Sequence, residues 1–181
     1  MSKYDEALNK YKELNKSAQG GGAVFFGADW IADFPIYELA KSNLLDTDIY
    51  NRSLKGLTID LAEKVIDTCV YSLSPEKVFI SIGENDILQE DFNCNDFSEK
   101  FEWLLYAIHS KCNCTIYILS VVNEKPDVIN KALKSIAEKY NCEYIDVQSY
   151  KDSFSKFFSK LCFFLRKRPV SFLEAMTLHT F

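Results

Sequence analysis

Apolar and polar positions along the chain alternate between two periodicities. Short apolar runs have the composition of buried strands, and the segments between them repeat apolar residues every three or four positions, as amphipathic helices do. The expected strands cover residues 23–28, 48–54, 77–83, 114–121 and 143–147, and the expected helices cover 3–16, 34–42, 58–73, 96–111 and 126–140. Strands that alternate with helices favour a parallel sheet with helices on both faces. The pattern predicts an α/β fold, a flavodoxin-like three-layer α/β/α sandwich with a five-stranded parallel sheet.

The two ends of the chain differ from this alternating region. Residues 1–19 are expected to form a leading amphipathic helix, and residues 150–181 form a divergent, strongly aromatic segment. With 181 residues, 48% of them hydrophobic, the chain is large enough for one core, so we expect a single domain over 1–181. The aromatic segment is either a terminal helix packed on the sheet or an exposed patch. Such a patch would serve a partner subunit in a homo-oligomer or a membrane surface.

The charge distribution argues against nucleic acid as a partner. The formal net charge is -5, and the lysines and arginines are scattered rather than clustered. We expect neither an N-terminal leader nor a bilayer-crossing segment, because no apolar run approaches the required length. The protein is therefore expected to be cytoplasmic, without stable membrane insertion.

The six cysteines could form three disulfides, but most lie in or beside segments expected to form the core. That placement favours buried free thiols. Cys112 and Cys114 lack a second ligand pair at zinc spacing, so no metal site is expected. No P-loop or Gly-x-Gly-x-x-Gly fingerprint is present, since Gly20, Gly21 and Gly22 precede the first strand, so no cofactor is expected.

Three segments with glycine and polar residues, 27–29, 51–56 and 83–86, follow successive expected strands. The carboxyl ends of parallel strands meet at one edge of a sheet, where ligands of such folds bind. We therefore expect the three segments to line one site.

Each of these segments lies within a longer sequence motif. The first is Phe26-Gly27-Ala28-Asp29-Trp30, the second is Asn51-Arg52-Ser53-Leu54-Lys55-Gly56, and the third is Ile80-Ser81-Ile82-Gly83-Glu84-Asn85-Asp86. In this order they resemble the SGNH hydrolases, also called the GDSL family of esterases and acylhydrolases. That family has Gly-Asp-Ser or Gly-Ser-Ser, Asn-Arg-Gly-Ile-Ser-Gly and Ile-Gly-Thr-Asn-Asp at the corresponding places. The resemblance covers about residues 23 to 147.

The resemblance implies acyl transfer in which a serine attacks an ester carbonyl and a late histidine takes its proton. Asp29 stands at the serine position, and a one-residue gap would place Trp30 there instead. His179 stands at the histidine position, with Met176 in place of the aspartate that orients it. A thioether cannot orient an imidazole or stabilise its charge.

The resemblance also implies the parts of an oxyanion hole or ligand site at Gly27, Ser53 and Asn85. Asn85 would contribute its side-chain amide, and residue 53 its backbone N–H. Each residue also has a purely structural interpretation. Asp29 could be the N-cap of the following helix, Asn85 could shape a turn, and His179 could be a surface side chain near the chain end.

Three functional hypotheses follow. The first is a diverged ester or acyl hydrolase, weakly active or inactive, that keeps a pocket for a small acylated or glycosidic ligand. The second is an active ester hydrolase that uses Asp29 and His179. The third is a non-catalytic, flavodoxin-like interaction domain. We favour the first, because two of the three catalytic positions lack their usual residue.

Overall fold

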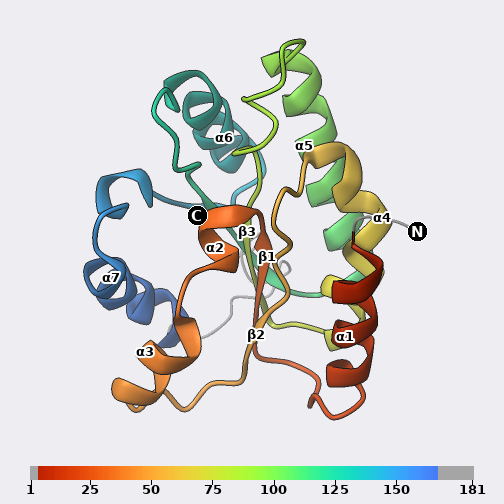
Figure 1. The fold of residues 1–181 in the computed structure, drawn as a ribbon, viewed down its shortest axis with the longest axis vertical. Coiled ribbons are helices and arrows are strands. Elements are labelled where there is room, and N and C mark those ends of the chain that lie inside the picture. The colour runs from red at the N-terminus through yellow and green to blue at the C-terminus, as the bar shows by residue number, and fades with distance from the viewer. Residues whose placement is uncertain (1–3, 167–181) are drawn as a thin grey trace, which may run out of the picture.

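Five parallel strands form the centre of the computed structural model, which describes residues 4–166. The strands are β1 (Ala23–Gly27), β2 (Ile49–Asn51), β3 (Lys77–Ser81), β4 (Thr115–Leu119) and β5 (Glu143–Ile145). They lie in the order β2-β1-β3-β4-β5, and every pair is parallel (Figure 1). The order reverses direction between β1 and β3, which is the switch point at which doubly wound sheets bind ligands.

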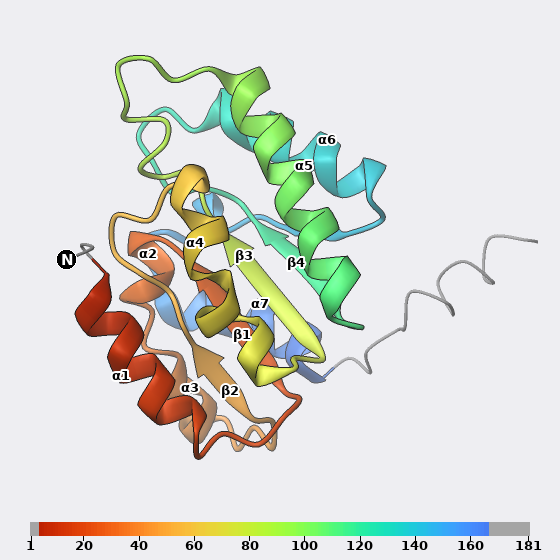
Figure 2. The same ribbon diagram turned by 90° about the vertical axis from the view of Figure 1, so that its right-hand side faces the viewer.

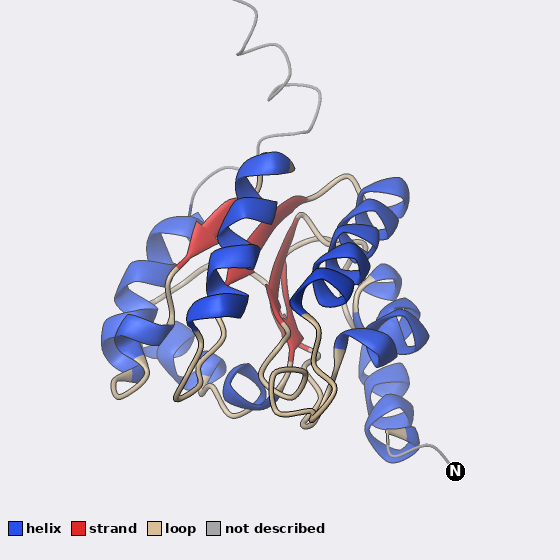
Figure 3. Ribbon diagram, turned by 90° about the horizontal axis from the view of Figure 1, so that it is seen from above, coloured by secondary structure: helices blue, strands red, loops and turns tan. Residues whose placement is uncertain are grey.

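Helices cover both faces of the sheet (Figure 3). One face is covered by α1 (Asp5–Asn15), α4 (Ile59–Cys69), α5 (Cys94–Lys111) and α6 (Asp127–Lys139), and the other by α2 (Asp29–Ala32), α3 (Ile36–Ser42) and α7 (Phe154–Arg166). Short 3-10 helices occupy Tyr71–Leu73 and Gln148–Tyr150. The predicted flavodoxin-like three-layer α/β/α sandwich is therefore confirmed.

The strands divide their side chains between two cores, because successive residues of a strand point to opposite faces. Val24 and Phe26 of β1 pack under the four-helix face, whereas Ala23 and Phe25 pack under the other. On that second face an aromatic row crosses three strands. The ring centroids of Phe25 and Phe79 lie 4.6 Å apart and those of Phe79 and Tyr117 lie 4.5 Å apart, both pairs stacked.

The boundaries differ from the predicted ones mainly near the site. Residues 29–32 form a separate short helix, α2, which the sequence pattern did not separate from the loop. The strand expected over 48–54 ends at Asn51, although the backbone N–H groups of Arg52 and Leu54 still bond to β1 carbonyls. The helix expected over 58–73 ends at Cys69 and continues as a 3-10 turn that stops at Ser74, whose φ is 44°.

The first half of the aromatic segment forms α7, which packs on the sheet. Phe157, Phe158, Leu161 and Leu165 are buried there, so the prediction of a packed helix is confirmed for residues 154–166. Residues 167–181, which include the predicted site residue His179, lie outside the described residues. All six cysteines are free thiols, as predicted. None of the helices within residues 4–166 combines the length and apolarity needed to span a membrane.

Candidate functional site

The three loops whose motifs resemble those of the SGNH hydrolases meet at the carboxyl edge of the sheet, as predicted. The backbone N–H of Leu54 donates to the carbonyl of Gly27 at 2.9 Å, and that of Ala28 donates to the carbonyl of Ser81 at 2.8 Å. These bonds tie the loops after β1, β2 and β3 to one another. Gly27 itself is required for this close approach, because a Cβ atom there would overlap the Ser81 carbonyl oxygen.

The carboxylate of Asp29 is held by donors from the other two loops. Its Oδ2 atom accepts a hydrogen bond from the backbone N–H of Gly56 at 2.9 Å and one from the side-chain amide of Asn85 at 2.5 Å. Asp29 is the first residue of α2, and Ala28 occupies the N-cap position. The N-cap interpretation of Asp29 is therefore wrong, whereas the expected meeting of Asp29 and Asn85 is realised.

The backbone donor from the second loop is Gly56 rather than residue 53. The N–H of Ser53 is engaged with Asn51 Oδ1 at 3.1 Å, and its hydroxyl donates to the carbonyl of Phe25 at 3.3 Å. Gly56 has φ of 72°, a conformation that glycine adopts without strain, and this turns its N–H toward the first loop. The N–H of residue 53, which was expected to serve an oxyanion hole, therefore points to Asn51, and the second-loop N–H that reaches Asp29 is that of Gly56. Gly56 ends the motif of residues 51–56, and this glycine was the sequence feature that could have indicated the donor.

Glu84 is a site residue that sequence reasoning missed. Only 7% of it is exposed, and its Oε2 atom accepts a hydrogen bond from the backbone N–H of Trp30 at 2.9 Å. Its other oxygen, Oε1, is buried and has no hydrogen-bond partner among the described residues. Burial raises the pKa of Glu84 to about 7, and the nearby charge of Asp29 adds to that increase. Glu84 is therefore a buried acid that holds the start of α2.

Asp86 plays a similar part at the next helix. Its Oδ1 atom accepts from the backbone N–H of Ile59, the first residue of α4, at 2.9 Å. Asp86 is 4% exposed, and burial raises its pKa to about 6. Carboxylates near helix N-termini satisfy backbone donors and interact favourably with the helix dipole. Asp86 thus fixes the loop that carries Asn85.

The side chains of Trp30 and His109 lie away from the Asp29 carboxylate. The Trp30 ring packs with Phe34 and Phe157, with ring centroids 5.3 Å apart in both pairs. His109 lies in the last turn of α5, which crosses from the carboxyl edge of β3 back to the beginning of β4. It is thus at the opposite edge of the sheet. Residues 4–166 bring no histidine to Asp29.

An open hollow of about 450 Å³ lies beside the site. It is bounded by Ser53, Leu54 and Lys55 of the second loop and by Ala32 of α2, with Tyr4 and Tyr11 on the opposite side. Tyr4 donates its hydroxyl to the Gly56 carbonyl and Tyr11 to the Ser53 carbonyl, each at 2.7 Å. The hollow therefore adjoins the same loop that supplies the Gly56 donor, and its size suits a small organic group.

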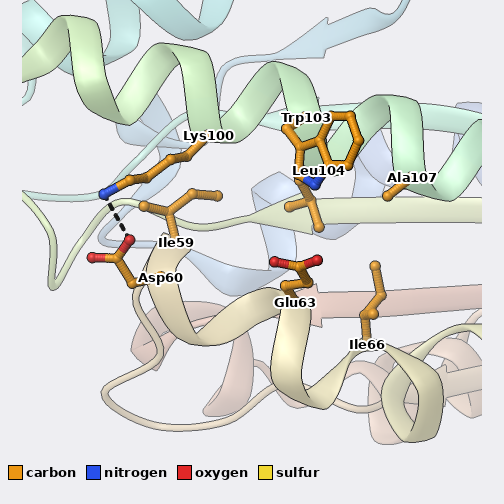
Figure 4. A pocket seen from close by; sticks show the side chains of 8 residues that line it. All are labelled: Ile59, Asp60, Glu63, Ile66, Lys100, Trp103, Leu104 and Ala107. Carbon is orange, nitrogen blue, oxygen red and sulfur yellow. Dashed lines mark ion pairs between the residues drawn. The ribbon is translucent and has the colours of Figure 1, made fainter.

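A separate groove of about 170 Å³ lies between α4 and α5 (Figure 4). At one end Lys100 pairs with Asp60 at 2.7 Å, and farther along Glu63 faces the ring of Trp103. This groove lies along the helix layer rather than beside the strand ends. Asp29, Gly56 and Asn85 take no part in it.

The arrangement around Asp29 has the chemistry of an anion site. Two N–H donors from different loops converge on one oxygen, at distances suited to an oxyanion that develops during acyl transfer. In this chain the oxygen belongs to Asp29 itself. The two donors thus bind a resident carboxylate.

Comparisons with known proteins agree with this geometry at the level of the fold. No protein-family model matches the chain, and no curated protein matches its sequence. Among solved structures, a protein from Streptococcus pneumonia described as a candidate platelet activating factor matches with a TM-score of 0.70 and 20% identity, over 89% of this chain and 92% of its own. The acetylxylan esterase Axe2 from Geobacillus stearothermophilus matches with a TM-score of 0.61 and 18% identity, over 78% and 81%.

A GDSL-like lipase from Bacteroides thetaiotaomicron also matches, with a TM-score of 0.61 and 18% identity, over 77% of each chain. Esterases and lipases of this kind recur among the similar structures. The order of the strands, the parallel sheet and the three loops at its carboxyl edge are consistent with that likeness. The chain has the SGNH hydrolase fold that its sequence motifs predicted.

Proposed function

We propose that this protein is a diverged member of the SGNH ester and acyl hydrolase lineage, with little or no turnover, which binds a small acylated or glycosidic ligand beside Asp29. The observation that carries this proposal is the position of the Asp29 carboxylate on the donors of Gly56 and Asn85. A substrate oxyanion would have to displace that carboxylate. Each donor of such a hole contributes about 3 kcal/mol to an acyl-transfer transition state, so their occupation opposes catalysis.

The residue at position 29 also weakens the chemistry directly. A carboxylate attacking an ester would form an anhydride, which is a less natural route than a serine ester. In the similar acetylxylan esterase, variants in which a serine or a histidine is replaced by alanine are described as catalytic mutants. Here aspartate stands at the serine position, and His109, the one histidine within residues 4–166, is remote from the site.

Ligand binding is supported by the hollow next to the Gly56 loop. The combination of tyrosine rings, the small side chain of Ala32 and the amine of Lys55, which pairs with Asp33 at 2.7 Å, suits a ligand with an apolar group and polar substituents. Since one of the similar structures is an acetylxylan esterase, acetylated xylo-oligosaccharides are the first ligands to test.

The test is hydrolysis of a short-chain aryl ester by the wild-type protein, Asp29→Ala and Asp29→Ser, with Asp46→Ser, at an exposed aspartate that does not line the hollow, as the control. We expect wild type and Asp29→Ala to give the same rate, and Asp29→Ser to exceed both because it restores a hydroxyl beside the two donors. Wild-type turnover that disappears in Asp29→Ala would contradict the proposal in favour of an active hydrolase that uses Asp29. If no variant hydrolysed the ester and the protein did not bind acetylated xylo-oligosaccharides, the result would favour a non-catalytic interaction domain.

A further inference from the structure

Arg52 follows β2 and is buried, with only 4% of its surface exposed. Its guanidinium is charged at any physiological pH. A buried charge is costly unless it is paired, usually with a carboxylate or another anion. The surroundings of Arg52 therefore bear on what this part of the molecule binds.

The guanidinium is held in place by neutral groups. Its Nε atom donates to Asn15 Oδ1 at 2.9 Å, and Nη1 donates to the carbonyl of Asn51 at 3.2 Å. The ring centroids of Tyr11 and Tyr50 lie 5.1 Å and 5.6 Å from its central carbon. No carboxylate of residues 4–166 forms an ion pair with Arg52. The side chain is thus fixed in orientation, while its charge has no counter-ion in the described part of the chain.

The end of the guanidinium still has donors to offer. Arginine carries five N–H donors, and two of them bond to described residues, which leaves three, on Nη1 and Nη2. Nη2 makes no hydrogen bond to a described residue. The side-chain atoms that are both fully buried and without a hydrogen bond do not include it. Nη2 therefore retains access to solvent. Nη1 and Nη2 together form the pair that binds carboxylate or phosphate with two parallel bonds.

A hollow of about 530 Å³ opens at this arginine. It lies between the end of α1 and the strand β2, two elements that run side by side in Figure 2. Leu14, Gln19, Tyr37, Asp48, Tyr50 and Arg52 contribute to its walls. The volume is within the range of small-molecule sites. Asp48 is exposed and adds one negative charge to the wall.

We propose that this hollow binds the carboxylate or phosphate group of a small ligand, with the end of the Arg52 guanidinium as the anchor. The anion would supply the counter-ion that the buried arginine lacks. It would rest against the ring of Tyr50, which already packs on the arginine and lines the hollow. The site is separate from the Asp29 carboxylate, because Asp29, Gly56 and Asn85 do not line this hollow.

The experiment is a titration of the isotope-labelled protein with sodium phosphate, and separately with sodium acetate, followed by amide chemical shifts. Sodium chloride at the same ionic strength is the baseline. We expect saturable shifts at Gln19 and Tyr50 with at least one probe, and the probe with the lower dissociation constant identifies the group. Arg52→Gln should weaken binding at least tenfold. Asp48→Asn should tighten it at least threefold, because it removes a like charge from the wall.

Asp46→Asn is the matched control, since it makes the same change in net charge at an exposed residue that does not line the hollow. It should leave the dissociation constant unchanged. The proposal is wrong if neither probe saturates the wild type, if a folded Arg52→Gln variant binds as tightly as wild type, or if Asp46→Asn and Asp48→Asn tighten binding equally. If Arg52→Gln fails to fold, the comparison of the two aspartate variants still decides.

Discussion

Replacing Glu84 by glutamine should change how the stability of the protein depends on pH. Glu84 is buried beside Asp29, and burial raises its pKa from an ordinary value of 4.5 to about 7. Between these two values the folded protein keeps the proton on Glu84 while the unfolded chain releases it. The folded state then binds more protons, so its stability falls as the pH rises through about 7.

The size of this effect follows from the shift. One pKa unit corresponds to about 1.4 kcal/mol, so a shift from 4.5 to about 7 limits the loss to about 3 kcal/mol. Glutamine is neutral in both states and escapes the penalty. The free energy of unfolding of Glu84→Gln minus that of wild type should therefore increase by 1 to about 3 kcal/mol between pH 4.5 and pH 8.

Urea denaturation of both proteins at several pH values between 4.5 and 8 measures this difference. Using the change with pH, rather than one absolute value, removes any constant cost of altering the bond to the Trp30 N–H. Glu90→Gln serves as the control, because it makes the same substitution at an exposed glutamate. If Glu84→Gln and Glu90→Gln followed the same pH dependence, a neutral, buried Glu84 would be refuted.

Three further predictions concern single contacts. Asp29→Ala removes two hydrogen bonds to a carboxylate and should lower the free energy of unfolding by about 2 kcal/mol; added acetate should raise its melting temperature more than that of Asp46→Ala, and an equal response would count against the anion site. Lys77→Met removes the bond from the buried Nζ atom to the Leu165 carbonyl, so amide hydrogen exchange should accelerate in the last turn of α7 but not in β3. Asn93→Ala removes the side-chain cap of α5 and should cost about 1 kcal/mol by urea denaturation, with Asn95→Ala, which keeps that cap, costing clearly less.

The sequence predicted the layers and the strands because both depend on local periodicity. Apolar runs such as 23–28 and 77–83 match β1 and β3 to within two residues at their ends. The helix α2 was missed because its four residues are too few to show a helical repeat. The strand β2 ends earlier than predicted, at Asn51, although the backbone N–H groups of Arg52 and Leu54 still bond to β1 carbonyls.

The site was predictable in its location and less so in its contacts. The motifs predicted that Asp29 and Asn85 lie at one edge of the sheet, because the carboxyl ends of parallel strands meet at the same edge. Whether Gly56 or residue 53 is the donor depends on the backbone path of one loop, in which Gly56 has a φ of 72°. The burial of Glu84 depends on packing between segments far apart in the chain, which no local pattern records.

We infer that the Asp29 carboxylate occupies two donors that would otherwise bind an oxyanion. The most direct test is the amide proton chemical shift of Gly56 in wild type, Asp29→Ala and the exposed-site control Asp46→Ala, because a bond to a carboxylate moves this proton downfield. We expect the Gly56 proton to move upfield in Asp29→Ala and to stay in place in Asp46→Ala. The same shift in all three proteins would show that the carboxylate does not bind this donor, and would contradict the account.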